Sequence, residues 1–144
     1  MKIWHYTLHP YLESLLTKGV ILPSKSYFIE LEVVWLSINS KWEETITNNI
    51  SHLLNKNGLF KLGIRPLRIE INPDLVKLQK WSDVIEHIDV SEESIKGLES
   101  LARQWGANPD QWYITYEAIP LENCISIEIW DDKKKWIVIG YKPQ

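Results

Sequence analysis

Apolar and polar positions in the first quarter of the chain predict a strand, a helix and a second strand. Residues 2–7 (Lys-Ile-Trp-His-Tyr-Thr) have the character of a short strand. Pro10 then stands where a proline can occupy the first position of a helix, and Gly19 is placed to end that helix. The run Val-Val-Trp-Leu at 33–36 is continuously apolar, which is typical of a central strand covered on both faces.

A second helix is expected after residue 40. Ser40 and Glu43 have the spacing of a capping box, in which each side chain satisfies an orphan backbone amide of the other residue. Asn57-Gly58 supplies a left-handed stop, and residues 60–64 and 67–71 resemble two strand pieces divided at Pro66. The apolar positions that keep helical spacing between these signals are Trp42, Ile46, Ile50, Leu53 and Leu54.

The second half of the chain predicts a loop, one helix and three strands. Residues 73–87 have poor periodicity, so we expect a loop there with a short helical turn over 75–78. The three strands are expected over 112–118, 124–130 and 136–141. Before them, one helical face ends at Gly106 and consists of Ile95, Leu98, Leu101, Ala102 and Trp105.

The order of these elements predicts an α+β fold in one domain that spans residues 1–144. Helices and strands are interleaved at first and strands dominate later, while a connection as short as 131–135 requires antiparallel pairing. We therefore expect a mixed or split, antiparallel-rich sheet with about three helices packed against it.

Composition narrows the classes of partner. A net charge of −3 offers no electrostatic basis for nonspecific nucleic-acid binding, and the lysines at 133–135 follow two aspartates as in a solvated turn. A single cysteine, Cys124, fits a reducing cytoplasm and is expected to be buried filler. The amino-terminal residues do not form a secretion signal, and no apolar run is long enough for a membrane span, so no membrane partner is expected.

Polar residues at strand positions are the candidates for chemistry, because no familiar phosphate-binding, zinc-protease, hydrolase or redox motif occurs. His5 and Thr7 lie two residues apart and therefore point to the same side of a strand. Ser37 follows the apolar run at 33–36, and Glu117 and Glu128 lie on late strands. Each also has a purely structural interpretation, such as a bond from the imidazole to a backbone carbonyl, a strand end or a solvent-facing position.

Four short pieces of the chain together resemble the ADP-ribosyltransferase fold. They are Trp4-His5-Tyr6-Thr7, Val34-Trp35-Leu36-Ser37, Trp42-Glu43-Glu44-Thr45 and Ile127-Glu128-Ile129-Trp130, and they are also similar to a widespread group of small, uncharacterised bacterial and phage-type proteins. The resemblance covers most of the chain.

The resemblance implies a site for NAD, used as a substrate and without a metal. His5 would hold the ribose and Thr7 the nicotinamide amide, while Glu128 or Glu117 would orient the ribose and activate the acceptor. One aromatic ring would stack on nicotinamide, with Tyr6, Tyr27 and Trp35 as candidates. We expect His5, Thr7, Ser37 and Glu128 to face one cleft.

Three functions follow as hypotheses. The first is an ADP-ribosyltransferase-like protein that binds NAD or a related nucleotide and transfers ADP-ribose to a macromolecule, expected to be a protein, as a toxin, modifier or anti-defence effector. The second is a phage-type or mobile-element protein that binds or sequesters a nucleotide without chemistry. The third is a protein-interaction module whose eight tryptophans form an exposed anchor patch.

Overall fold

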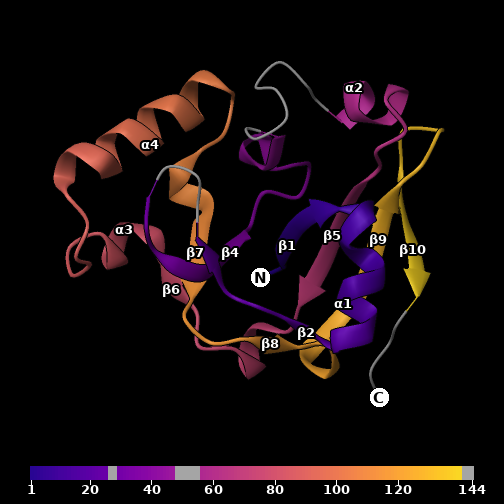
Figure 1. Ribbon diagram of the computed structural model, residues 1–144, viewed down its shortest axis with the longest axis horizontal. Helices are drawn as coiled ribbons and strands as arrows, with labels where there is room; N and C mark the ends of the chain where they lie inside the picture. Colours follow the sequence, from indigo (N-terminus) through magenta and orange to yellow (C-terminus); the bar gives the residue numbers. More distant parts are fainter. Residues whose placement is uncertain (26–28, 48–55, 141–144) are drawn as a thin grey trace.

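An antiparallel sheet is the framework of the computed structural model, which describes residues 1–25, 29–47 and 56–140. Its spatial order is β10-β9-β5-β1-β4-β7-β6, and β3 pairs with β4 outside this path (Figure 1). The strands are β1 (Ile3–Leu8), β3 (Ser24–Lys25), β4 (Glu32–Ser37), β5 (Pro66–Ile71), β6 (Gln79–Lys80), β7 (Trp112–Thr115), β9 (Cys124–Trp130) and β10 (Trp136–Gly140).

Short helices and one small ladder complete the fold. The two strands of the separate ladder are β2 (Val20–Ile21) and β8 (Ile119–Pro120). The α-helices are α1 (Leu12–Lys18), α2 (Lys56–Lys61), α3 (Trp81–Val84) and α4 (Glu92–Gln104), and the 3-10 helices are η1 (His9–Tyr11), η2 (Glu44–Thr47), η3 (Pro73–Leu75), η4 (Pro109–Gln111) and η5 (Leu121–Asn123). Within the described residues, no helix has the length and apolar character that a membrane crossing requires.

Strand β1 lies at the centre of the sheet, and its two ladders differ greatly in length. With β5 it pairs at every position from Ile3 opposite Ile71 to Leu8 opposite Pro66. With β4 it pairs where Trp4 lies opposite Ser37. The sheet is therefore tightly joined on the β5 side of β1 and splits on the β4 side.

The two faces of the sheet carry different cores. One face, which we call the α1 face, buries Ile3, Ile69 and Ile127 beneath α1; Figure 1 shows α1 in front of β5 and β9. The opposite face, which we call the α4 face, holds two clusters. One packs β4 and β7 against α3 and α4, and the other gathers Trp4, Tyr6, Leu8, Trp42 and Leu59.

The structure confirms the coarse fold class and most of the expected elements. The fold is α+β with a mostly antiparallel sheet, and β1, α1, β4, β5, α4, β9 and β10 lie where the pattern predicts them. Gly19 ends α1 in the left-handed conformation (φ 70°), which a residue with a side chain rarely adopts. The lysines at 133–135 form the expected turn between β9 and β10.

The prediction for residues 40–64 is wrong in two places. No helix begins at Ser40, because the Glu43 carboxylate accepts a hydrogen bond from the Trp112 indole instead of capping a helix. Asn57-Gly58 and Phe60 belong to α2, so the expected stop and the strand over 60–64 are absent, and the turn comes at Gly63 (φ 79°). Burial of Leu59 against the sheet outweighs these local signals. Ile50, Leu53 and Leu54 lie outside the described residues.

Two other segments differ in detail. The expected turn over 75–78 is replaced by η3 and the later helix α3, because Trp81 is buried among the side chains of the α4 face. Strand β7 ends at Thr115 rather than at 118, and a bend at Tyr116 and Glu117 follows it.

The amino-terminal cap of α4 gives a stability test. The Ser91 side chain accepts a hydrogen bond from the Ser94 amide at 3.1 Å. We expect Ser91→Ala to lower the free energy of unfolding by about 1 kcal/mol, because it leaves that amide without its partner. Urea denaturation followed by tryptophan fluorescence measures the loss. Ser100→Ala, at an exposed position inside the same helix, should leave stability unchanged or slightly raised; equal losses in both variants would contradict the capping role.

Candidate functional site

The imidazole of His5 bridges the split between β1 and β4. Its Nδ1 lies 2.9 Å from the carbonyl oxygen of Trp35. Because a carbonyl only accepts, Nδ1 must carry the hydrogen, and burial lowers the pKa of the ring from its ordinary value of 6.5. The neutral ring therefore presents Nε2 as a hydrogen-bond acceptor.

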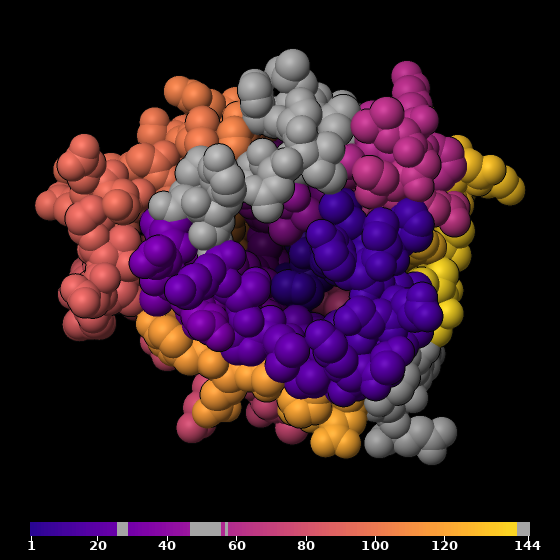
Figure 2. Space-filling model, in the orientation of Figure 1, coloured from indigo at the N-terminus to yellow at the C-terminus, as the bar shows by residue number. Residues whose placement is uncertain are grey.

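Thr7 lies on the same face as His5. It is opposite Leu67 in the ladder, as His5 is opposite Ile69, and both residues are half-buried on the α1 face. Figure 2, which views this face, shows a hollow between the indigo amino-terminal segment and the violet segment that carries β3 and β4. The expectation that His5 and Thr7 point the same way is confirmed.

Tyr6, Trp35 and Ser37 lie on the opposite, α4 face. The Tyr6 hydroxyl donates to the carbonyl of Asn39, and burial raises the pKa of Tyr6 to about 12. The Ser37 hydroxyl accepts from the Asn39 amide at 3.0 Å. The Trp35 ring packs against Trp81, with 5.0 Å between the ring centroids. Tyr27, the third candidate for a stacking ring, lies outside the described residues.

Glu128 lies on the α4 face as well, where it neutralises Arg68. The two residues are opposite each other in the β5–β9 ladder, and Arg68 Nη2 donates to Glu128 Oε1 at 2.9 Å. The guanidinium lies between two indoles, 4.7 Å from the ring centroid of Trp4 and 4.5 Å from that of Trp136, and it also donates to the carbonyl of Ser40. We call Arg68, Glu128, Trp4 and Trp136 the Arg68 cluster.

The structure thus divides the predicted site residues between two faces. His5 and Thr7 lie on the α1 face, whereas Ser37 and Glu128 lie on the α4 face. The expectation that these four side chains share one cleft is wrong, because strand pairing places Glu128 in register with Arg68 and Tyr6 rather than with His5. The catalytic and cofactor-binding roles themselves stay predictions.

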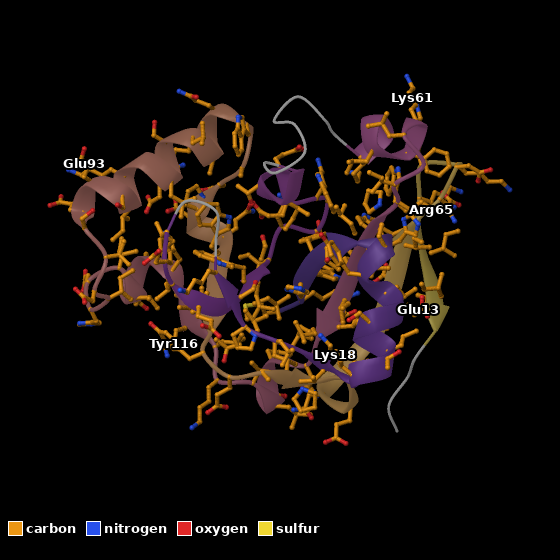
Figure 3. All side chains as sticks on the ribbon, viewed as in Figure 1. Glu13, Lys18, Lys61, Arg65, Glu93 and Tyr116 are labelled. Carbon is orange, nitrogen blue, oxygen red and sulfur yellow. The ribbon has the colours of Figure 1, made fainter. Side chains whose placement is uncertain are left out.

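Glu117 has the more open surroundings of the two candidate acids. Thr115, two residues earlier, is opposite Val34 on the α1 face. The Glu117 side chain is 63% exposed and lies 3.6 Å from Lys77 Nζ. Tyr116, which precedes it, points outward at the margin of the molecule in Figure 3. The ion pair of Glu117 is exposed, unlike that of Glu128, and among the described residues no hydrogen bond or ion pair joins Glu117 to His5.

The sequence analysis missed Glu43 as a buried acid. The residue is 6% exposed, its Oε1 accepts from Trp112 Nε1 at 3.0 Å, and its Oε2 is buried without a hydrogen-bond partner. Burial raises the pKa of this carboxyl above its ordinary value of 4.5. Its spacing from Ser40 predicted a helix cap, so nothing in the sequence indicated that the carboxyl is buried. The buried pairing of Arg68 with Glu128 was not anticipated either, although a charged residue inside a predicted strand is a usable signal.

Two other kinds of chemical site, a metal site and a reactive thiol, are not supported among the described residues. No group of three His, Cys, Asp or Glu side chains there could hold a metal ion. Cys124 is 2% exposed, and burial raises the pKa of its thiol to about 12, which disfavours the reactive thiolate. The expectation of a buried filler cysteine is confirmed.

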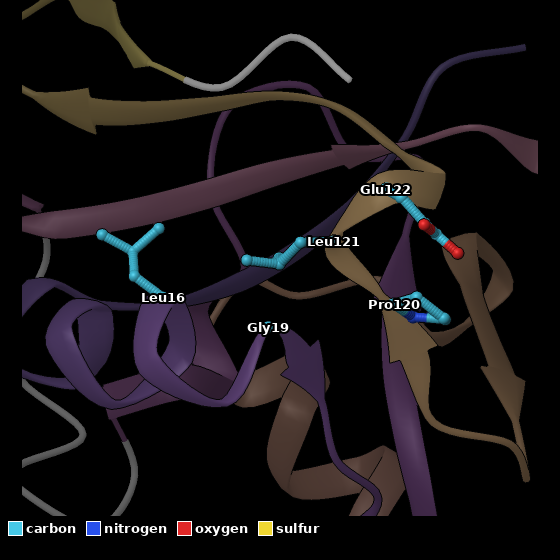
Figure 4. Close-up of a pocket in the computed structure, with 5 residues that line it drawn as sticks. All are labelled: Leu16, Gly19, Pro120, Leu121 and Glu122. Atoms are coloured by element: carbon cyan, nitrogen blue, oxygen red, sulfur yellow. The ribbon is translucent and has the colours of Figure 1, made fainter. Parts of the chain in front are cut away.

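A second hollow, of about 400 Å³, lies where α1 meets β8 (Figure 4). It contains none of the predicted site residues, and one ionisable side chain, Glu122, is at its edge. Its lining residues are Leu16, Gly19, Pro120, Leu121 and Glu122.

Comparison with known proteins adds no relative: no protein family, no curated protein and no solved structure matches the chain.

The two late glutamates should respond differently to neutralisation. We expect Glu128→Gln to lower the free energy of unfolding by about 3 kcal/mol, because it leaves the buried Arg68 guanidinium without its counterion. Glu117→Gln should cost less than about 0.5 kcal/mol, since its partner is exposed. Urea denaturation of both variants measures the difference. Similar losses would contradict a structural role that is specific to Glu128.

The buried Glu43 carboxyl should make stability depend on pH. Its pKa is higher in the folded state, so the folded chain retains a proton that the unfolded chain releases above about pH 4.5. The free energy of unfolding should therefore fall as pH rises from 4.5 to the folded pKa of Glu43, and Glu43→Gln should remove this fall. Urea denaturation from pH 4.5 to 8 measures it, with Glu122→Gln as an exposed control. An unchanged pH profile in Glu43→Gln would contradict the assignment.

Proposed function

We propose that this chain is an ADP-ribosyltransferase-like protein that binds NAD or a related nucleotide on the α1 face, beside His5 and Thr7. The observation that carries the proposal is the split between β1 and β4, which the His5 imidazole bridges through the Trp35 carbonyl. A neutral imidazole fixed in this way offers its Nε2 to a ribose hydroxyl, and the nearby Thr7 hydroxyl is suited to an amide group. We also propose a cytoplasmic location, which the single buried cysteine supports.

The chemistry proposed for this site is transfer of ADP-ribose to a macromolecular acceptor, expected to be a protein. The bond between nicotinamide and the ribose C1′ breaks, nicotinamide leaves with the bonding electron pair, and an acceptor nucleophile forms the new bond to C1′ and loses its proton. A carboxylate stabilises the positive charge that develops on the ribose. Glu117 suits this role better than Glu128, because Glu128 is paired with Arg68 on the opposite face.

The position of Glu128 also favours a second candidate function, in which the protein binds or sequesters the nucleotide unchanged. Such a protein needs the recognition groups of the α1 face and no acid on that face. The third hypothesis, an exposed tryptophan anchor, has less support. Four of the indoles are at most 5% exposed, and the other four are half-buried. The four buried residues are Trp4, Trp42, Trp81 and Trp112.

Ligand binding is tested by the melting temperature in the presence of NAD. At a hundredfold excess over Kd, we expect a rise of about 5–10 °C by mass action. His5→Asn should lose this rise, because the Asn side-chain amide can still donate to the Trp35 carbonyl but has no counterpart of Nε2. His87→Asn, at an exposed position, is the matched control and should keep the rise. An equal rise in wild type and His5→Asn would contradict the site.

Transfer is tested separately with labelled NAD and a cell lysate. Release of nicotinamide together with a labelled protein supports transfer, and Glu117→Gln should abolish both without lowering the melting temperature. Binding of NAD without either product supports the second candidate and removes the enzymatic proposal.

A further inference from the structure

Strand β10 forms one outer edge of the sheet, and its surface is unusually apolar. It ends the strand order beyond β9, and Figure 1 shows it at the margin of the molecule. Three consecutive side chains are exposed there, Ile137 by 42%, Val138 by 55% and Ile139 by 44%. No residue from 136 to 140 is charged. Edge strands of soluble proteins usually carry charges that prevent pairing with other chains, and β10 has none.

Strand β9, which pairs with the inner edge of β10, indicates what kind of strand the outer edge could bind. The two strands pair in antiparallel register, with Ile129 opposite Ile137 and Trp130 opposite Trp136. Apolar side chains alternate along β9, and two acids, Asp131 and Asp132, follow its carboxyl end. An incoming strand of the same pattern would meet the same apolar side chains of β10 from the other side.

The turn that precedes β10 adds positive charge at one end of this edge. Asp131 is 7% exposed, and its Oδ1 accepts hydrogen bonds from the amides of Lys133 and Lys135 at 3.0 and 2.8 Å. Lys133, Lys134 and Lys135 are themselves exposed. The turn therefore presents three ammonium groups, while one of its two carboxylates is engaged in holding its backbone.

We propose that the outer edge of β10 docks an extended segment of another protein as an added antiparallel strand. The segment has alternating apolar residues followed by acidic residues at its carboxyl end. Antiparallel pairing brings that end beside Lys133 and Lys135, where charges of opposite sign meet. A second copy of β10 is a poorer match, because its own residues 136–140 include no acid that could face these lysines. This surface is independent of the nucleotide site proposed on the α1 face.

The test uses a fluorescein-labelled peptide that copies residues 125–132, Ile-Ser-Ile-Glu-Ile-Trp-Asp-Asp, and measures its anisotropy with the full chain. We expect saturable binding that Val138→Lys weakens at least about tenfold, since it places a charge on the edge. Leu75→Lys, at a position in η3 that is 54% exposed, is the matched control and should bind as wild type does.

The contribution of charge is tested outside the strand, which keeps the experiment decisive if Val138→Lys does not fold. Lys133→Glu combined with Lys135→Glu should weaken binding about fivefold or more and reduce its salt dependence, as should a peptide that ends in Asn-Asn. Absence of binding, or equal binding by wild type and both edge variants, overturns the proposal. Concentration-dependent dimerisation that Val138→Lys abolishes assigns the edge to a second copy and also overturns it.

Discussion

The arrangement of the α4 face depends on the contacts of the Arg68 guanidinium, above all its buried ion pair with Glu128. The guanidinium joins β5 to β9 through Glu128, packs between indoles from β1 and β10, and holds the segment after β4 through the Ser40 carbonyl. A charge this deeply buried is tolerated only where its donors are satisfied and its counterion is close. Since the guanidinium also packs against Trp4 and Trp136, this part of the α4 face serves to hold the strands together.

Much of the fold could be predicted from the sequence, because most strands and the longest helix have strong patterns. The alternation in 124–130 and the apolar face of 92–104 each specify one element with clear ends. The failures lie where a tertiary contact overrides a local signal. Glu43 has the spacing of a helix cap, yet its carboxylate accepts a hydrogen bond from Trp112. Helix α2 continues through Asn57-Gly58 because Leu59 is buried against the sheet. Neither contact partner is adjacent in the sequence.

The candidate site was less predictable than the fold. Alternation correctly placed His5 and Thr7 on one face, because the period of two is a property of a single strand. Which face Glu128 occupies depends on the register between β5 and β9, and a shift of one residue would reverse it. That register is set by the packing of Arg68 and the isoleucines of both strands, which a single sequence does not reveal.

The central position of β1 has a consequence for how the chain assembles during synthesis. Strand β1 pairs with residues 66–71, and those residues pair in turn with 124–130. Such long sequence separations make folding slow, because loop entropy is lost before the contacts form. Most of the polypeptide must therefore emerge before β1 is enclosed, and until then its apolar side chains stay open to chaperones.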